Sequence, residues 1–158
     1  MIQRIQSVYL AIITILCGLV FVFPFGEITI PNGSVIMDGF SIISQDSKIT
    51  AELFKPWPVT ILALLAALLA PACIAQFKNR TLQMKMCRLN ALFLLGLIFS
   101  MFYLIDKAQA MFEGMQIEAE IHYGIGTYLP LLAVVLNILA TRAIKKDDKL
   151  VRSADRLR

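Results

Sequence analysis

The chain has 158 residues, of which 58% are hydrophobic and 16% are charged. A soluble domain needs about a quarter charged residues to cover its surface, so this composition excludes an ordinary soluble domain and indicates a membrane protein. The net charge of +4 does not indicate nucleic-acid binding, because the basic residues lie where membrane topology places them. No nucleic-acid partner is expected.

Four apolar segments are each long enough for a helix to cross hydrocarbon about 30 Å thick. They predict an all-α membrane protein, a bundle of four transmembrane helices that forms one integral-membrane domain over residues 1–158. The expected boundaries are spans at 5–26, 56–77, 88–106 and 125–143, outer loops at 27–55 and 107–124, and a basic cytoplasmic tail at 144–158. The first segment is too long for a secretory signal and lacks a small-residue cleavage site, so it is expected to remain as a span.

The orientation follows from the distribution of charge. Twelve of the fifteen Lys and Arg residues lie before the first span, between the second and third spans, or after the fourth. Eight of the eleven acidic residues lie in or beside the other two loops. Because short cytoplasmic loops are enriched in Lys and Arg, both chain termini are expected in the cytoplasm.

The outer loops contain strand patterns. The first loop begins EITIPNGSVIM, in which two alternating runs flank a Pro-Asn-Gly turn signal, so a hairpin is expected. In the second outer loop, the run 106–115 is helix-permissive and is expected to continue the third span, and residues 117–123 then alternate as a half-buried strand does. An isolated hairpin is marginal in water, so the third strand is expected to join it in a small extracytoplasmic antiparallel sheet that caps the bundle.

The spans contain no ionisable residue near a midplane, which argues against a proton- or cation-coupled carrier. Two amides, Asn90 in the third span and Asn137 in the fourth, are the candidate intramembrane polar contacts. Such a residue contacts a substrate or, more commonly, donates an interhelical hydrogen bond worth roughly 1 kcal/mol. Pro71 lies deep in the second span and acts either as a hinge or as a fixed bend.

Residues suited to catalysis are scarce. His122 is the single histidine, and it lies in the expected outer strand, where it cannot form a His-rich metal site. Cys17, Cys73 and Cys87 lie in spans or at a cytoplasmic span end, so neither a structural disulfide nor an outward-facing redox pair is expected. We therefore expect no catalytic residue, no cofactor, no metal and no enzymatic activity.

The tail offers a candidate contact surface for a partner or for lipid. Leu150, Ala154 and Leu157 fall on one helical face, and most other positions are charged. The tail is therefore either a continuation of the fourth span or a basic helix that rests on the inner leaflet, with a solvated tail as the alternative. The candidate contact residues are Lys149, Arg152, Asp155, Arg156 and Arg158.

Three stretches carry a resemblance to a known family: MIQRIQSVYL at 1–10, GTYLP at 126–130 and KLVRSADRLR at 149–158. The chain resembles an uncharacterised family of small four-span bacterial inner-membrane proteins, defined as a domain of unknown function. The resemblance implies a multi-pass protein of a Gram-negative inner membrane. The family has no assigned catalytic or binding residues.

Two functional hypotheses follow. In the first, the chain is a non-enzymatic structural or accessory subunit of a larger membrane complex, docked through the outer sheet or the basic tail. In the second, it is a small transporter, channel or lipid-binding protein, alone or as a homo-oligomer in the lipid bilayer. An enzyme acting on lipid or envelope substrates is a third and weaker hypothesis, because the spans lack the residues for it.

Overall fold

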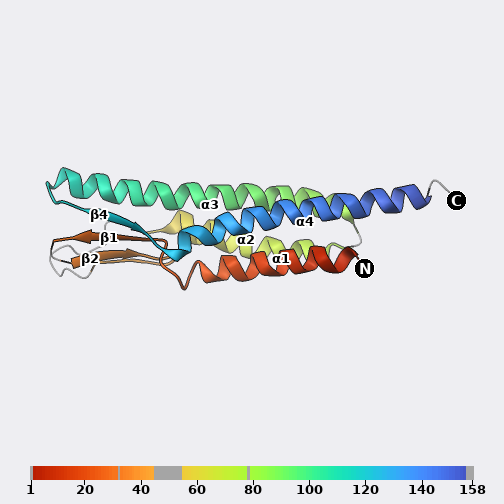
Figure 1. Ribbon diagram of the computed structural model, residues 1–158, viewed down its shortest axis with the longest axis horizontal. Coiled ribbons are helices and arrows are strands. Elements are labelled where there is room, and N and C mark those ends of the chain that lie inside the picture. Colours follow the sequence, from red (N-terminus) through yellow and green to blue (C-terminus); the bar gives the residue numbers. More distant parts are fainter. Residues whose placement is uncertain (1, 32, 45–54, 78, 156–158) are drawn as a thin grey trace.

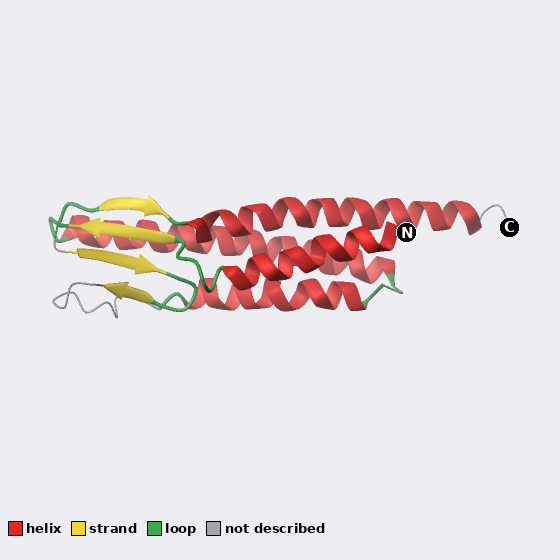
Figure 2. Ribbon diagram, turned by 60° about the horizontal axis from the view of Figure 1, so that its bottom comes forward, coloured by secondary structure: helices red, strands yellow, loops and turns green. Residues whose placement is uncertain are grey.

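The computed structural model describes residues 2–31, 33–44, 55–77 and 79–155. Four helices lie side by side, and a small sheet extends beyond three of them alongside the far end of the longest helix, so the molecule is elongated along the helix axes (Figure 1). The start of α1 and the end of α4 lie at the end opposite the sheet (Figure 2). We call these two ends of the molecule the sheet end and the termini end. A mostly helical chain with a small antiparallel sheet is confirmed.

The four helices differ in length. Three of them, α2 to α4, are long and apolar enough to cross a membrane, whereas the apolar part of α1 is shorter, at Ile5–Leu19. The bounds are Ile2–Leu19 for α1, Trp57–Ala75 for α2, Arg80–Gly114 for α3 and Ile125–Asp155 for α4. Pro71 lies inside α2, which continues through it.

Helix α1 is shorter than the expected first span, 5–26. The helix ends at Leu19, and the amides of residues 20–23 donate to carbonyls of Leu16, Gly18 and Leu19 in closing turns. Pro24 follows, and a proline disfavours helical conformation in the residue before it. Val20 and Phe25 then turn inward and are fully buried beneath the sheet.

The sheet has four antiparallel strands in the order β3-β2-β1-β4. The bounds are Gly26–Ile30 for β1, Gly33–Met37 for β2, Ile42–Ser44 for β3 and Glu120–Tyr123 for β4. The expected hairpin and its third strand are confirmed, although β4 begins later than the pattern at 117–123 suggests. Strand β3 was not expected, because three residues are too few for an alternating pattern to be recognised.

Helix α3 is the longest element and joins the two ends of the molecule. It continues past the third span along the sheet, as the helix-permissive run 106–115 predicts. The expected cytoplasmic loop before it is shorter than its sequence suggests, because the helix already begins at Arg80, where the Asn79 side chain accepts a hydrogen bond from the Leu82 amide at 3.1 Å. Such a cap satisfies one of the free amides of a helix start.

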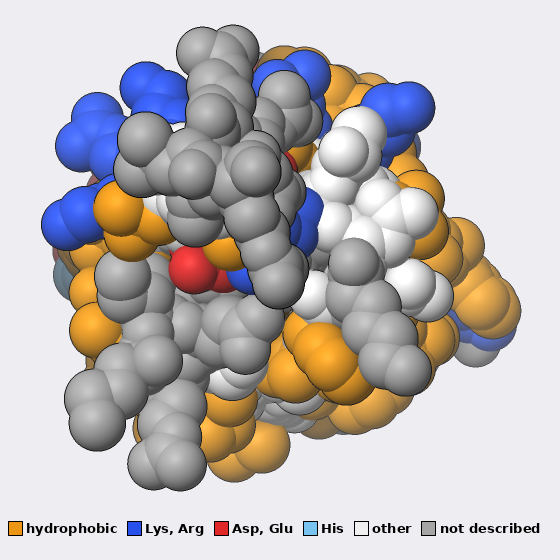
Figure 3. All heavy atoms as spheres, turned by 90° about the vertical axis from the view of Figure 1, so that its right-hand side faces the viewer, with side chains coloured by type: hydrophobic (Ala, Val, Ile, Leu, Met, Phe, Trp, Pro, Cys, Tyr) orange, Lys and Arg blue, Asp and Glu red, His pale blue; other side chains and the backbone are white. Residues whose placement is uncertain are grey.

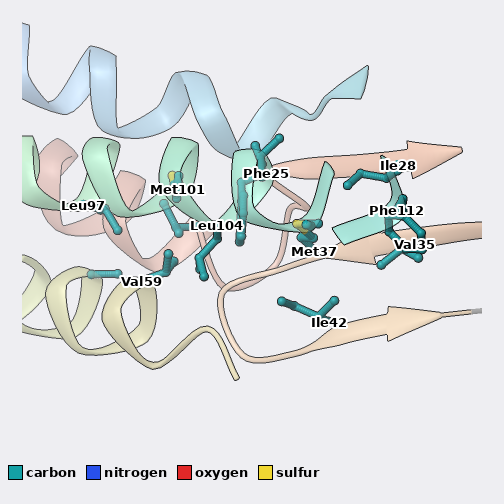
Figure 4. Packing of buried hydrophobic residues seen from close by; sticks show 14 of the residues in the cluster. Phe25, Ile28, Val35, Met37, Ile42, Val59, Leu97, Met101, Leu104 and Phe112 are labelled. Atoms are coloured by element: carbon teal, nitrogen blue, oxygen red, sulfur yellow. The ribbon is translucent and has the colours of Figure 1, made fainter. Parts of the chain in front are cut away.

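A cluster of large apolar side chains holds the sheet to α3 (Figure 4). Phe112 of α3 and Ile28, Val35 and Met37 of the sheet are almost fully buried there. We call this group the sheet-end cluster; its buried members are Val20, Phe25, Ile28, Ile30, Val35, Met37, Ile42, Val59, Ala63, Leu97, Met101, Leu104, Ile105, Ala108 and Phe112. Over the expected strand 117–123, Ile117, Ala119 and Ile121 pack against the cluster while Glu118, Glu120 and His122 are exposed, as the alternation predicts. The pattern fails at Tyr123, which is half exposed.

Two tight junctions fix the sheet relative to the helices. At the end of α3, Gln116 has a φ of 58°, and the amides of Gln116 and Ile117 donate to the carbonyls of Glu113 and Phe112 at 3.0 and 3.1 Å. This arrangement is a Schellman motif, which closes a helix through one left-handed residue. It turns the chain from α3 into β4.

The second junction joins β4 and α4 to the segment between α1 and β1. The amides of Gly124 and Gly126 donate to the carbonyls of Phe25 and Pro24 at 3.1 and 2.9 Å, and the Thr127 hydroxyl donates to the Phe25 carbonyl. A methyl group on Gly124 would overlap the Pro24 carbonyl. Glycine is therefore required here by the close approach of two backbones.

Candidate functional site

The basic tail is a rigid continuation of α4. The helix is unbroken from Ile125 to Asp155, so the chain does not turn after the expected fourth span, 125–143, to form a separate helix. We call its segment 142–155 the basic arm. Figure 1 shows the arm projecting past the ends of the other helices.

An ion pair ties the base of this arm to α3. The Arg80 guanidinium lies 3.0 Å from the Asp147 carboxylate through Nη2, and its Nη1 donates to the Asp147 carbonyl at 3.3 Å. Both side chains are mostly buried, with 22% and 15% of their surfaces exposed. A two-point contact of this kind fixes orientation as well as distance. It sets the direction in which the arm leaves the bundle.

The exposed basic side chains of the arm surround this ion pair. Figure 3 shows Lys and Arg side chains gathered around the termini end. Of the predicted contact residues, Lys149 is exposed on α4. Arg152 and Asp155 also belong to α4, although only their backbone is described, and Arg156 and Arg158 lie outside the described residues. The exposed basic residues of the arm are Arg142, Lys145, Lys146 and Lys149.

The two predicted intramembrane amides lie at the same level of the bundle. Helices α3 and α4 are adjacent and antiparallel, and Arg80 pairs with Asp147. Asn90 and Asn137 each lie ten residues from this ion pair, in the direction of the sheet. Both side chains are buried, with 0% and 1% of their surfaces exposed. Among the described residues, neither the oxygen nor the nitrogen of either amide has a hydrogen-bond partner.

The family model described as "Domain of unknown function (DUF4293)" matches residues 2–157 of the chain. The chain belongs to this family. The match includes the Asn90–Asn137 level and the whole of the basic arm. The comparison with curated proteins finds no match.

A second polar level lies nearer the termini end in this DUF4293 member. The Cys87 thiol of α3 lies 3.9 Å from the Cys73 sulfur of α2, and Gln83 Nε2 donates to the Cys73 carbonyl at 3.1 Å. Thr141 of α4 interacts with Cys87, and its hydroxyl donates to the Asn137 carbonyl at 2.9 Å. Cys17 belongs to α1 and is also buried. Polar side chains of α2, α3 and α4 therefore meet in the part of the bundle nearest the chain termini.

Sequence reasoning identified Asn90 and Asn137 separately but could not bring them together. Helix α3 ends and α4 begins on either side of β4, so no short loop between them reveals the register. The pairing of Arg80 with Asp147 was also missed in the sequence, because each residue lies among other charged residues that the membrane topology explains. A signal for the Gly124–Gly126 junction was present as a Gly-x-Gly pattern before an apolar run, although its partner, Pro24, is distant in sequence.

Proposed function

We propose that this DUF4293 member is a non-enzymatic structural or accessory subunit of a membrane assembly in the bacterial inner membrane. It crosses the bilayer four times, with the termini end in the cytoplasm and the sheet end outside. The observation that carries the proposal is the basic arm held by the Arg80–Asp147 ion pair. A solvated tail that only anchors topology has no need of a fixed direction.

The proposed topology rests on helix length and charge. Helix α1 has 18 residues, which corresponds to about 27 Å and is near the lower limit for a span. Exposed basic side chains mark the termini end, whereas Glu113, Glu118 and Glu120 are exposed at the sheet end. The positive-inside rule therefore favours a cytoplasmic arm.

The arm provides the docking surface in this proposal. Helix α4 has 31 residues and measures about 46 Å, which exceeds the hydrocarbon thickness of about 30 Å. The excess presents Lys145, Lys146 and Lys149 at and beyond the membrane surface. An acidic surface on a larger membrane protein complements these charges, and charge complementarity sets both encounter rate and register.

Affinity purification from native membranes tests this role. We expect a stoichiometric partner to be recovered with the wild-type protein and lost when Lys145, Lys146 and Lys149 are changed to Gln. The matched control is Lys85→Gln with Arg88→Gln, which removes exposed basic residues of α3 outside the arm and should retain the partner.

The direction of the arm is tested by charge reversal. Arg80→Asp places two carboxylates together and should reduce partner recovery, and adding Asp147→Arg should restore it. Changing the tail residues Asp155, Arg156 and Arg158 together should also reduce recovery. Repeated recovery of the wild-type protein alone, or with anionic lipid alone, would contradict the accessory role.

A small transporter, channel or lipid-binding protein is the second candidate, and the four unpartnered amide atoms of Asn90 and Asn137 favour it. Buried amides without partners are costly, so a bound polar molecule would stabilise them. Mass spectrometry of molecules that copurify with the protein tests this candidate. A species present with the wild type and absent from the Asn90→Ala, Asn137→Ala double variant is expected, and identical spectra would contradict it.

A further inference from the structure

A groove of about 320 Å³ lies between α3 and β4 at the sheet end. Its volume is at the lower end of the range for small-molecule sites. One wall is the face of α3 that includes Phe102, Asp106 and Gln109, and the other is formed by Ile121 and Tyr123 of β4. The groove therefore lies where the third helix leaves the apolar segment and enters the sheet.

The helical wall of the groove changes from apolar to polar along α3. Phe99 and Tyr103 are stacked, with ring centroids 6.3 Å apart, and both are more than half exposed. Phe102 lies against Tyr123 at 5.7 Å. Asp106 lies about one helical turn after Phe102, in the direction of the sheet. Amphipathic aromatic rings of this kind gather at the boundary between hydrocarbon and headgroups.

The polar part of the groove offers hydrogen-bond acceptors. Gln109 Nε2 donates one of its two N–H groups to Glu113 Oε1 at 2.7 Å, and the amide oxygen of Gln109 is an acceptor. Asp106 and Gln109 are three residues apart, and both line the groove. Among the described residues that line it there is no Lys or Arg. A cationic group, such as an ammonium, is therefore complementary to this part of the groove.

We propose that this groove binds the primary ammonium headgroup of an outer-leaflet phospholipid, with phosphatidylethanolamine as the class of ligand. The ammonium donates to the Asp106 carboxylate and to the Gln109 oxygen, and the exposed faces of the tyrosines attract its charge. A quaternary ammonium has no N–H group and cannot make these hydrogen bonds. The groove holds a headgroup, and the acyl chains lie along Phe99 and Tyr103.

Native mass spectrometry of the full-length protein tests the proposal, with equal amounts of phosphatidylethanolamine, phosphatidylcholine and phosphatidylglycerol in the micelles. We expect phosphatidylethanolamine to be retained in preference to the other two, and Asp106→Asn to reduce this retention about tenfold. Glu118→Gln is the matched control, because Glu118 is an exposed carboxylate of the same end that does not line the groove. It should retain the preference.

Several results would overturn the proposal. Equal retention of the three lipids, or equal loss with Asp106→Asn and Glu118→Gln, would exclude recognition of the ammonium by Asp106. Recovery of a dimer without bound lipid would assign the groove to a second copy of the chain. Each variant changes an exposed side chain, so both are expected to fold. Thermal unfolding of the two variants checks this. The accessory role stands or falls separately, because it depends on partner recovery through the basic arm.

Discussion

The two ends of the helical bundle are packed with different residues. In the sheet-end cluster the buried side chains are mainly large, and alanine occurs there at Ala63 and Ala108. The cluster nearer the chain termini is rich in alanine and cysteine. We call it the termini-end cluster; its buried members are Leu10, Ile13, Leu16, Cys17, Ala66, Ala70, Cys73, Cys87, Leu94, Ala133, Ala140 and Ile144.

The proposed membrane position gives the two ends different solvents. Where the sheet meets water, burying large apolar side chains provides the driving force for packing. Within lipid that force is absent between helices, and close approach through small residues with interhelical hydrogen bonds replaces it. Ala70 and Ala140 are small residues, as packing between helices in lipid favours. Phe112 and Met37 are large apolar residues, as packing in water favours. The proposed membrane position thus accounts for both compositions within one bundle.

The largest expected effect is at the junction that belongs to the sheet end. Gly124→Ala places a methyl group against the Pro24 carbonyl, where the backbone cannot give way without breaking the hydrogen bond from Gly124 to Phe25. We expect the free energy of unfolding in detergent micelles to fall by about 3 kcal/mol or more.

Gly18→Ala is the control for this substitution. Among the described residues nothing lies within 4 Å of the added methyl group, and Gly18 is part of α1. Alanine favours helix by up to about 1 kcal/mol relative to glycine, so this variant should be as stable as the wild type or slightly more stable. Equal destabilisation by both substitutions would contradict the backbone contact at Gly124.

An intermediate effect of opposite sign is expected in the termini-end half. Asn90→Leu with Asn137→Leu replaces two unpartnered amides by apolar side chains of similar size. Because a buried unsatisfied polar group costs about 1–3 kcal/mol, each single variant should unfold with a free energy roughly 1–3 kcal/mol higher, and the double variant should be the most stable of the three. Unfolding in mixed detergent micelles measures the change. A loss of stability would mean that the amides have a partner in the purified protein.

The smallest expected effect is at the end of α3. Gln116 has a left-handed backbone, which glycine adopts without a steric penalty. Gln116→Gly should raise the free energy of unfolding by about 0.5–1 kcal/mol. Met115→Gly is the neighbouring control, because Met115 has a φ of −88° and gains nothing from glycine. The comparison is contradicted if the two variants change stability equally.

The elements that could be predicted from the sequence are those with a local physical signature. Runs without charge revealed the helical segments, and the Pro-Asn-Gly turn revealed the hairpin. The end of α1 at Leu19 was not predictable from hydropathy, because Val20 to Phe25 are as apolar as the helix, although Val20 and Phe25 are buried in the sheet-end cluster. Asn90 and Asn137 lie at the same height along the bundle because of how α3 packs against α4. No local sequence pattern predicts that packing.

Helix α3 also has a mechanical consequence. Its 35 residues form one continuous helix without proline, about 53 Å long, from Arg80 at the termini end to Phe112 beneath the sheet. A tilt of about 10° at one end displaces the other by about 9 Å. A force on Asp147 would act on α3 through the ion pair with Arg80. Because α3 is one continuous helix, a tilt caused at this end would move the sheet at the other end.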